Sequence, residues 1–310
     1  MAALPKRPLG RTGIDATILG YGAMELRGAP RGPEVSDEDA AAILNAVLDS
    51  GINYIDTSPD YGRSEELIGK SISGRRSEYF LASKCGCIVG GTPAPANQPN
   101  PHVFTAENVR AGVEQSLRRM NTDYLDLVQF HGSPTPEQLR ADGGLDALLE
   151  LQREGKVRHI GMSGTLPNLP AQIEMGVFEA FQVPYSAIQR EHETVIARAA
   201  GAGAGVVIRG GAARGAPSDW EHKSDRLLPP NPRDRWDNAG LEDLLNGMSP
   251  MEFTLRFTLS NPDLDTTIVG TRNPAHLRAN VEAAVKGPLP ESIVAEAKRR
   301  LAAAGSAPQA

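Results

Sequence analysis

The sequence predicts an α/β protein, a (β/α)8 TIM barrel with a short N-terminal hairpin and an extra C-terminal helix. Short runs rich in β-branched and aromatic residues alternate with longer amphipathic runs along the whole chain. The strand-like runs number eight, and a length of 310 residues suits eight β/α units. We therefore expect a single domain that spans residues 1–310.

The expected strands are short apolar segments bounded by polar or turn residues. They cover residues 16–21, 52–56, 79–83, 124–130, 159–162, 180–183, 205–209 and 266–269. The expected helices alternate with these strands and show amphipathic spacing. They cover residues 37–50, 64–71, 106–120, 136–154, 170–175, 189–200, 250–259 and 274–284, with an extra helix over residues 291–303 packed outside the barrel.

The ends of the expected helices carry local signals. Ser36 precedes an acidic first turn, and Thr105 stands three residues before Asn108, so both suit the N-cap position. Gly51 and Gly155 follow amphipathic segments, and glycine is the residue that most often closes a helix. These signals support the helix boundaries that the periodicity indicates.

Segments outside the repeating pattern are expected to shape the two ends of the barrel. Residues 7–17, with glycine turn points, predict a hairpin that plugs the bottom. Residues 86–104 and 210–238 are dense in Gly, Pro and Asn and follow strands. Loops after barrel strands surround the active site, so we expect both segments to wall a substrate pocket. Trp220 and Trp236 favour this interpretation over that of a floppy insertion.

Composition and charge limit the class of partner. The chain is 40% hydrophobic and 23% charged, and its formal net charge of -6 provides no general attraction for nucleic acid or an anionic membrane. No run approaches the roughly 20 apolar residues needed to span a bilayer. The first residues lack the apolar core of a secretory signal. We expect a cytoplasmic protein whose partners are small molecules.

Motif searches for other chemistries are negative. Cys85 and Cys87 stand too close together for an easy disulfide and make a poor metal set, so we interpret them as structural thiols. Neither His-Glu-x-x-His nor a paired Cys-x-x-Cys is present, and the motifs therefore indicate no metal. The glycines over residues 201–205 precede a strand instead of following one, which excludes a Rossmann fingerprint, and Ser64 stands where a P-loop needs glycine.

Four polar residues fall at or just after the ends of consecutive expected strands. Asp56 ends the second strand, Tyr61 lies in the loop that follows, Lys84 follows the third strand and His131 the fourth. The C-terminal ends of barrel strands meet on one face, and neighbouring strands lie about 4.8 Å apart. We therefore expect these side chains to converge. Taken singly, the same four residues would suit a helix cap, a packed aromatic residue, a solvated lysine and a core histidine.

These residue types suit the reduction of a carbonyl group, which needs a hydride on carbon and a proton on oxygen. A tyrosine phenol has a pKa of about 10, and a nearby ammonium is expected to lower that pKa. Lys84 supplies the ammonium, and Asp56 can hold it charged and oriented. His131 can donate to the substrate oxygen. Tyr61 is thus the expected general acid.

The motifs around these residues resemble the aldo-keto reductase family over nearly the whole chain. They are Leu9-Gly10-Arg11-Thr12-Gly13, Gly51-Ile52-Asn53-Tyr54-Ile55-Asp56-Thr57, Tyr61-Gly62-Arg63-Ser64-Glu65, Lys84, Tyr124-Leu125-Asp126-Leu127 and His131. The resemblance implies a monomeric-type TIM barrel that uses NADPH. It implies Tyr61 as the acid, Lys84 and Asp56 as the groups that tune it, and His131 as the residue that orients the substrate.

The resemblance also implies a site for the nicotinamide carboxamide. The segment Gly161-Met162-Ser163-Gly164 is similar to the family's segment after the fifth strand, where a serine and an asparagine usually hold this group. Gly164 replaces the asparagine. Ser163 and Gln182 are therefore the residues that the resemblance implies for the carboxamide.

After the seventh strand, residues 208–215 resemble the family's pyrophosphate and nicotinamide loop, which includes Gly210 and Arg214. Arg209 stands where many members carry a stacking aromatic residue. A guanidinium forks onto phosphate oxygens, so Arg209 is expected to contact phosphate or ribose. A structural salt bridge is the alternative.

After the last strand, the run that begins with Gly270 and Thr271 resembles the family's segment around the adenosine. The helix N-terminus there suits an anion. The resemblance assigns the 2′-phosphate to Arg272, with Thr271 assisting, which favours NADP(H) over NAD(H); a surface cation is the alternative. His276 and Asn280 follow on the helix, with Asn280 implied at the adenine.

Together, the residues and the resemblance predict an NADPH-dependent oxidoreductase that reduces an aldehyde or ketone to an alcohol. We expect it to be a monomer or weak homo-oligomer that acts on a small-molecule carbonyl substrate. Two alternatives keep the same fold. One is an NADP-binding, redox-sensing or regulatory barrel with a protein partner, similar to the potassium-channel β subunits. The other is an alcohol-oxidising enzyme of a biosynthetic pathway. The intact acid set favours an enzyme over a pure binding protein.

Overall fold

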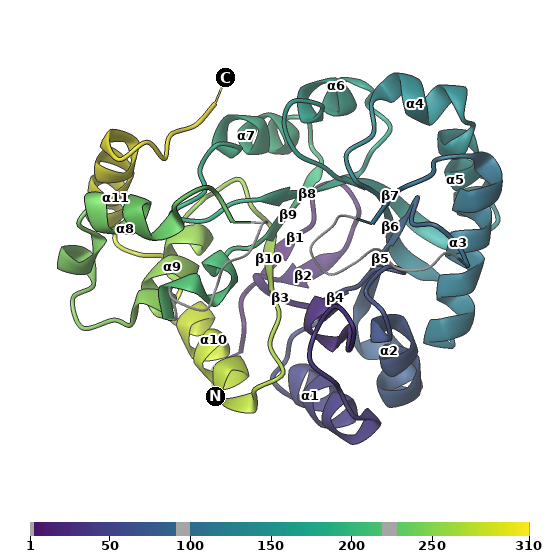
Figure 1. The fold of residues 1–310 in the computed structure, drawn as a ribbon, viewed down its shortest axis with the longest axis horizontal. Coiled ribbons are helices and arrows are strands. Elements are labelled where there is room, and N and C mark those ends of the chain that lie inside the picture. Colours follow the sequence, from purple (N-terminus) through teal and green to yellow (C-terminus); the bar gives the residue numbers. More distant parts are fainter. Residues whose placement is uncertain (1–2, 91–99, 219–227, 310) are drawn as a thin grey trace.

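The computed structural model describes residues 3–90, 100–218 and 228–309. Within them, parallel strands close into a barrel in the order β10-β3-β4-β5-β6-β7-β8-β9, and Figure 1 shows the helices arranged around it. The barrel strands are β3 (Leu19–Gly22), β4 (Tyr54–Asp56), β5 (Phe80–Cys85), β6 (Leu125–His131), β7 (Val157–Ser163), β8 (Ala180–Pro184), β9 (Gly205–Arg209) and β10 (Thr266–Val269). The expected (β/α)8 TIM barrel is confirmed.

The helices cover the outer face of the barrel. They are α1 (Asp37–Asp49), α2 (Ser64–Ile72), α3 (Ala106–Met120), α4 (Pro136–Ala141), α5 (Gly144–Arg153), α6 (Leu169–Glu174), α7 (Glu193–Gly201), α8 (Pro232–Asn238), α9 (Pro250–Leu259), α10 (Pro274–Lys286) and α11 (Glu291–Ala303). Short 3-10 segments are η1 (Ala23–Leu26), η2 (Ser73–Glu78), η3 (Ala213–Ser218) and η4 (Leu241–Leu244). The extra C-terminal helix α11 packs beside α8, outside the barrel (Figure 1).

Helices begin where side chains satisfy their first backbone N–H groups. The Ser36 hydroxyl accepts from the Asp39 N–H at 3.0 Å at the start of α1. The Thr105 hydroxyl accepts from the Asn108 N–H at 3.3 Å at the start of α3. Such caps satisfy donors that have no partner inside the helix. The N-caps expected at Ser36 and Thr105 are therefore confirmed.

The expected helix over residues 136–154 is wrong, because the chain forms α4 and α5 there instead. Gly143 separates the two with a φ of 69°, a left-handed conformation that interrupts an α-helix. At Gly144 a Cβ atom would lie 2.2 Å from the carbonyl oxygen of Phe104. The close approach of these two backbone segments explains why the chain turns here.

Two other segments differ from the expectation by more than a shift of one or two residues at an end. The helix expected over residues 189–200 begins at Glu193, because Ser186 and Gln189 exchange two backbone hydrogen bonds of 3.1 Å in a tight turn. The strand expected over residues 16–21 is two strands, β2 (Asp15–Thr17) and β3. Between them, the Ile18 N–H bonds to the Pro5 carbonyl at 2.9 Å, and the chain passes from a hairpin into the barrel.

A hairpin of β1 (Lys6–Pro8) and β2 closes the N-terminal end of the barrel, as expected for residues 7–17. Its apolar side chains form a second core with residues on the barrel strands. This core contains Leu9, Ile14, Ala16, Tyr54, Ala82, Leu127, Ala180, Val207 and Ile268. The Gly10 N–H also donates to the carboxylate of Asp265 at 3.1 Å, just before β10. The bottom of the barrel is thus packed with side chains.

We expect Gly10→Ala to destabilise the fold more than Gly13→Ala. At Gly10 a Cβ atom would lie 2.2 Å from the Gly205 backbone nitrogen, whereas at Gly13 nothing lies within 4 Å. Both glycines have positive φ values, 49° and 75°, so alanine strains the backbone at either position. The difference in stability between the two variants therefore reports the steric clash at Gly10. Urea denaturation should show a further loss of about 1–3 kcal/mol for Gly10→Ala. Equal losses would contradict a tightly packed plug.

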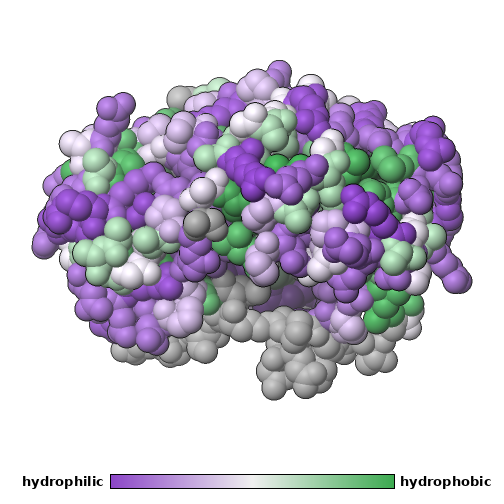
Figure 2. All heavy atoms as spheres, turned by 90° about the horizontal axis from the view of Figure 1, so that it is seen from above, coloured by the Kyte–Doolittle hydropathy of each residue, from purple (hydrophilic) through white to green (hydrophobic). Residues whose placement is uncertain are grey.

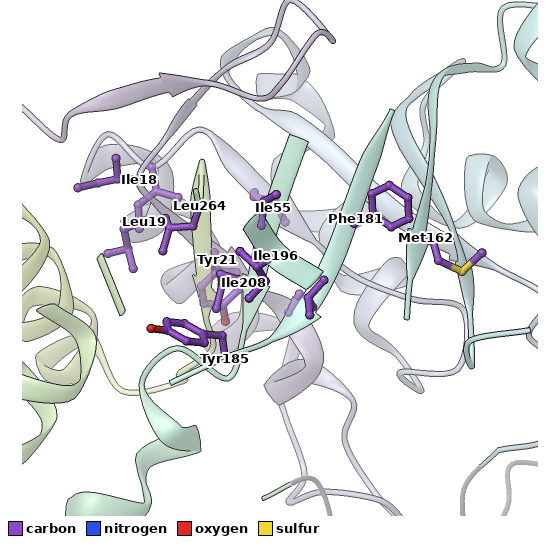
Figure 3. Close-up of a cluster of buried hydrophobic side chains, with 14 of the residues drawn as sticks. Ile18, Leu19, Tyr21, Ile55, Met162, Phe181, Tyr185, Ile196, Ile208 and Leu264 are labelled. Atoms are coloured by element: carbon purple, nitrogen blue, oxygen red, sulfur yellow. The ribbon is translucent and has the colours of Figure 1, made fainter. Parts of the chain in front are cut away.

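The main apolar core lies between the barrel and its helices. Figure 3 shows Ile196 of α7 near Ile208 of β9, together with Tyr185, Tyr21 and other buried side chains. Tyr21, Ile196 and Ile208 are each 0% exposed. Because this core surrounds the barrel, it holds the strand ends in fixed relative positions.

The described parts of the two long segments contain regular structure and are not simple connecting loops. Cys87 and His102 form an isolated antiparallel bridge that closes the segment over residues 86–104 at its base. The segment over residues 210–238 includes η3 and α8. Trp236 on α8 is 1% exposed and packs edge-on against Phe253, so it is a core residue and does not support the interpretation of this segment as a pocket wall. Trp220 lies outside the described residues.

The visible face in Figure 2 carries mostly hydrophilic residues with hydrophobic ones interspersed among them. Among the described residues, none of the helices combines the length and apolar character that a transmembrane span requires.

Candidate active site

The four residues of the expected acid set lie at the C-terminal ends of three adjacent strands. Asp56 is the last residue of β4, and Tyr61 lies in the turn before α2. Lys84 stands inside β5, one residue before its end, and His131 is the last residue of β6. These strands are neighbours in the barrel, so the four residues share one face of it.

Lys84 and Asp56 form a buried ion pair. The Lys84 ammonium donates to Asp56 Oδ1 at 2.7 Å and to the Thr57 carbonyl at 2.8 Å, and both side chains are about 1% exposed. The alternative of a solvated lysine is therefore wrong. Burial acts to lower the pKa of Lys84, but the neighbouring Asp56 carboxylate and Tyr61 outweigh it, and the pKa is raised. Lys84 is a fixed positive charge in this site.

The second oxygen of Asp56 is held by two amides. Gln129 Nε2 on β6 donates to Asp56 Oδ2 at 3.1 Å, and Gln182 Nε2 on β8 donates to the same atom at 2.8 Å. The carboxylate therefore accepts hydrogen bonds on both oxygens. A buried charge needs such partners. The network locks the orientation of Asp56 and, through it, that of Lys84.

The local backbone holds Tyr61 next to the Lys84–Asp56 ion pair. Its N–H donates to the Ser58 carbonyl at 3.0 Å. Gly62 follows with a φ of 49°, and a Cβ atom there would lie 2.1 Å from the Arg27 carbonyl oxygen. Glycine at this position lets the turn press against the end of η1. The Lys84 ammonium nitrogen consequently lies 5.2 Å from the centroid of the Tyr61 ring.

The electrostatics of Tyr61 differ from the expectation. Burial raises the pKa of Tyr61 more than the Lys84 ammonium lowers it, and the carboxylates of Asp56 and Asp60 raise it further. Lys84 acts in the expected direction, but it does not outweigh the loss of water around the phenol. Tyr61 therefore carries its proton at neutral pH.

His131 meets Tyr61 edge-on, with ring centroids 6.2 Å apart and planes at 85°. Burial lowers the pKa of His131 to about 3, against the opposing effect of the Asp60 carboxylate. The imidazole is therefore neutral at neutral pH, with one N–H donor and one acceptor. Its Nδ1 lies 3.6 Å from Asp60 Oδ2.

The residues implied for the carboxamide lie on the next strands around the barrel. Ser163 ends β7 and is paired with Gln182 of β8 in the sheet register. The Ser163 hydroxyl donates to Gln182 Oε1 at 3.2 Å. The amide of Gln182 thus joins Ser163 to Asp56, so the acid set and the expected cofactor residues belong to one hydrogen-bond network.

Arg209 ends β9 beside this network. Its side chain is partly buried and makes no hydrogen bond or ion pair within the described parts of the chain. The alternative of a structural salt bridge is therefore not supported there. Burial lowers the pKa of Arg209, and nearby Arg214 adds to this effect. A guanidinium without an anionic partner at this rim is suited to bind one.

The loop after β9 has an unusual backbone. Gly210, Ala213, Arg214 and Gly215 have φ values of 73°, 45°, 54° and 80°. Positive φ is uncommon for Ala and Arg, and it occurs at functional turns. At Gly211 a Cβ atom would lie 2.2 Å from Thr267 Oγ1, so the chain passes close to β10.

The last cofactor segment joins β10 to α10. The Thr271 carbonyl accepts from the Tyr21 hydroxyl at 2.9 Å, which fastens this turn to β3. Arg272 is exposed and donates to the Glu34 carbonyl at 3.1 Å. His276 and Asn280 lie one turn apart on α10, with His276 exposed and Asn280 partly buried.

Residues 18–300 match the model of the Aldo/keto reductase family. The chain belongs to this family. Among curated proteins, it is 29% identical over 293 residues to the uncharacterized oxidoreductase YqkF of Bacillus subtilis, with 90% of each chain covered. It is 28% identical over 307 residues to L-galactose dehydrogenase of Arabidopsis thaliana, with 91% of this chain and 89% of that one covered.

A solved structure of a family member has the same fold. The holo form of aldo-keto reductase AKR11C1 from Bacillus halodurans is 27% identical, covers 96% of both chains and has a TM-score of 0.82. Membership makes this chain an oxidoreductase of the aldo/keto reductase type. Members of the family typically bind a nicotinamide cofactor.

Some residues of this aldo/keto reductase site were not among those expected from the sequence. Gln129 bonds to Asp56, and the Thr57 carbonyl accepts from Lys84. A glutamine inside the apolar run Leu127-Val128-Gln129-Phe130 of β6 was a usable signal, because a buried polar side chain needs a partner. Asp60 and His102 were also missed. They approach His131 only through the folded loops, and nothing in the linear pattern indicates that.

Proposed function

We propose that this protein is an NADPH-dependent oxidoreductase that reduces an aldehyde or ketone to an alcohol, with Tyr61 as the general acid. The observation that carries the proposal is the buried Lys84–Asp56 pair beneath the Tyr61 ring, with a neutral His131 beside it. A structural ion pair alone would not need a protonated phenol and a neutral imidazole beside it. A carbonyl reductase needs both.

The residues at the rim fit a nicotinamide dinucleotide. Arg209 is a partly buried guanidinium without an anionic partner among the described residues. The turn from Ala213 to Gly215 has three successive residues at positive φ, an uncommon backbone of the kind that clusters at ligand-binding sites. In this proposal Ser163 and Gln182 hold the carboxamide, and Arg209, with Gly210 and Arg214, holds phosphate or ribose.

The adenosine half is assigned to the segment after β10. Gly270 lies so close to β3 that a Cβ atom would be 2.5 Å from the Gly22 carbonyl oxygen, which keeps this turn at the barrel rim. In the proposal, Arg272 binds the 2′-phosphate with help from Thr271, and Asn280 contacts the adenine. His276 stands one turn before Asn280 on the same face of α10.

When bound, the reduced cofactor supplies the hydride. The chain's own residues handle the proton and the substrate oxygen. His131 donates its N–H to the carbonyl oxygen and orients it, which a neutral imidazole can do without itself losing a charge. Tyr61 gives its phenolic proton to that oxygen as negative charge develops there. Lys84 then stabilises the phenolate that remains.

The raised pKa of Tyr61 keeps the phenol protonated at neutral pH, although it also makes the phenol a weaker acid, so Lys84 has to assist the proton transfer. A phenol that keeps its proton at neutral pH is ready to act as an acid, and the fixed charge of Lys84 contributes at the moment the proton leaves. The same groups work in reverse, since a phenolate beside Lys84 can accept the proton of an alcohol. The relative named L-galactose dehydrogenase makes alcohol oxidation the direction to measure alongside reduction.

The direct test titrates purified protein with NADPH and with NADH by cofactor fluorescence, and then follows absorbance with a panel of aldehydes and ketones. We expect NADPH to bind more tightly than NADH and to be consumed when a carbonyl compound is added. Oxidised cofactor with the matching alcohols measures the reverse reaction. Binding without turnover in either direction would favour a regulatory barrel, and absence of binding would contradict the cofactor assignment.

We expect Arg272→Ala to weaken NADPH binding by about 10- to 100-fold, the effect of losing a charged hydrogen bond, and to leave NADH binding unchanged. The guanidinium is exposed and makes one hydrogen bond, to a carbonyl, within the described residues. Arg278→Ala is the matched control, because Arg278 is an exposed arginine on α10, six residues after Arg272. A parallel loss for both cofactors would place the 2′-phosphate elsewhere.

A further inference from the structure

Four side chains with metal-binding atoms meet beside the candidate active site. Asp60 comes from the loop after β4, Cys87 from the residues just after β5, His102 from the end of the following segment and His131 from the end of β6. We call these residues the Asp60 cluster. One donor atom from each residue lies within 4.8 Å of the other three. The cluster assembles a carboxylate, a thiol and two imidazoles.

The separations suit one small cation. Asp60 Oδ2 lies 3.6 Å from His131 Nδ1 and 3.9 Å from His102 Nε2, and Cys87 Sγ lies 3.6 Å from His131 Nδ1. A tetrahedral zinc site with bonds of about 2.0–2.3 Å has ligand atoms roughly 3.3–3.8 Å apart. Three edges of such a tetrahedron are thus nearly formed. Small side-chain rotations would close the others.

Two of the donor atoms, those of His102 and Cys87, lack a strong hydrogen-bond partner among the described residues. His102 Nε2 is buried and has no hydrogen-bond partner among the described residues. Buried polar atoms in folded proteins nearly always have one, so this atom calls for an explanation. The Cys87 thiol is also buried, and it makes only the weak hydrogen bonds of a thiol, with Ser58 Oγ at 3.5 Å and His131 Nδ1 at 3.6 Å. A cation at the centre would satisfy these atoms together.

Surrounding groups hold the donors in place. Ser58 Oγ donates to Asp60 Oδ1 at 2.6 Å and Asn100 Nδ2 donates to Asp60 Oδ2 at 3.1 Å, so the carboxylate is held with Oδ2 near the two imidazoles. The backbone bridge between Cys87 and His102 fixes two donors relative to each other. Asn108 Nδ2 donates to the Cys87 carbonyl at 3.0 Å and so anchors this bridge to α3. Outer hydrogen bonds of this kind orient the ligands of metal sites.

We propose that the Asp60 cluster binds a single Zn²⁺ ion, with Asp60, Cys87, His102 and His131 as its four ligands. One sulfur, two nitrogens and one oxygen form a mixed set that suits zinc, and magnesium and calcium prefer oxygen alone. Binding replaces the proton of the Cys87 thiol, which passes to solvent, and no electrons are transferred. Thiolate and carboxylate together offset the charge of the cation, as a buried site requires.

The site goes beyond the proposed function and does not depend on it, because its readouts involve neither cofactor nor turnover. Protein freed of metal with a chelator is titrated with Co²⁺, whose tetrahedral thiolate complexes absorb in the near ultraviolet and the visible. We expect both bands to saturate at one equivalent and to disappear when Zn²⁺ is added. Absence of a band would overturn the proposal.

Matched variants locate the ion. Cys87→Ser should abolish the charge-transfer band, and Cys85→Ala, which removes the other buried thiol of the chain, should retain it. His102→Gln should weaken Zn²⁺ binding by at least about tenfold and reduce the rise in Tm that one equivalent of Zn²⁺ gives. Circular dichroism of the metal-free variants checks that each is folded. A band that persists in Cys87→Ser, or an equal Tm rise in His102→Gln, would contradict the site.

Discussion

Tyr61→Phe is expected to lower kcat for carbonyl reduction by about 10²- to 10⁴-fold, the usual contribution of a positioned general acid. The substitution removes the hydroxyl group that gives up its proton and leaves the aromatic ring in place. Lys84 and Asp56 keep their hydrogen bond, since the hydrogen bonds of Lys84 go to Asp56 and to the Thr57 carbonyl and not to the phenol. The Kd for NADPH should therefore stay within about twofold of the wild-type value, because the lost group acts on the substrate oxygen.

The control for this variant is Tyr124→Phe. Tyr124 lies just before β6, and its ring packs against the guanidinium groups of Arg76 and Arg158, at the end of the strand opposite to His131. Removing its hydroxyl should leave kcat and the Kd for NADPH unchanged. Stopped-flow absorbance and cofactor fluorescence measure the two quantities. Full turnover by Tyr61→Phe would exclude this residue as the acid.

Lys84→Met is expected to cost about 3–5 kcal/mol of unfolding free energy as well as activity. The change leaves the Asp56 carboxylate buried without its counter-charge, and a charge stranded in this way is strongly destabilising. Asp56 keeps its hydrogen bonds from Gln129 and Gln182, but amides cannot offset a full negative charge. Urea denaturation followed by circular dichroism measures the loss.

Two further variants separate the buried pair from a general effect of losing a lysine. Lys70→Met removes an exposed lysine that pairs with Asp37 and Glu66, and we expect it to cost no more than about 1 kcal/mol. Adding Asp56→Asn to Lys84→Met removes the stranded charge and should recover part of the stability, although not the activity. If Lys84→Met is no less stable than Lys70→Met, the pair does not stabilise the fold.

The barrel could be predicted from the sequence because its periodicity is local. Alternating strand-like and amphipathic runs, with caps such as Ser36 and Thr105, predict the element order. The barrel geometry then brings strand ends together, which is why Asp56 and Lys84 could be placed on one face before any distance was known. The prediction of one helix over residues 136–154 was wrong because of a contact between distant parts of the chain. The helix is interrupted at Gly143, where the backbone of Phe104 comes close to Gly144.

The finer properties of the site depend on contacts that have no linear signature. The pKa of Tyr61 depends mainly on how much water the fold removes from around the phenol, whereas the sequence indicates only the neighbouring charge of Lys84. The bond from Gln182 to Asp56 joins residues 126 positions apart. The Asp60 cluster likewise needs the chain to leave β5 and return at His102.

The β1–β2 hairpin prevents molecules from entering the barrel at its N-terminal end. Because its side chains fill the N-terminal end, the barrel interior is not a channel, and the candidate site is reached from its other end. Two reactants must then share one entrance. The one that lies deeper has to arrive first and leave last, since the other blocks its exit. For a two-reactant oxidoreductase this geometry favours a fixed order of arrival and departure, and product inhibition patterns would record that order.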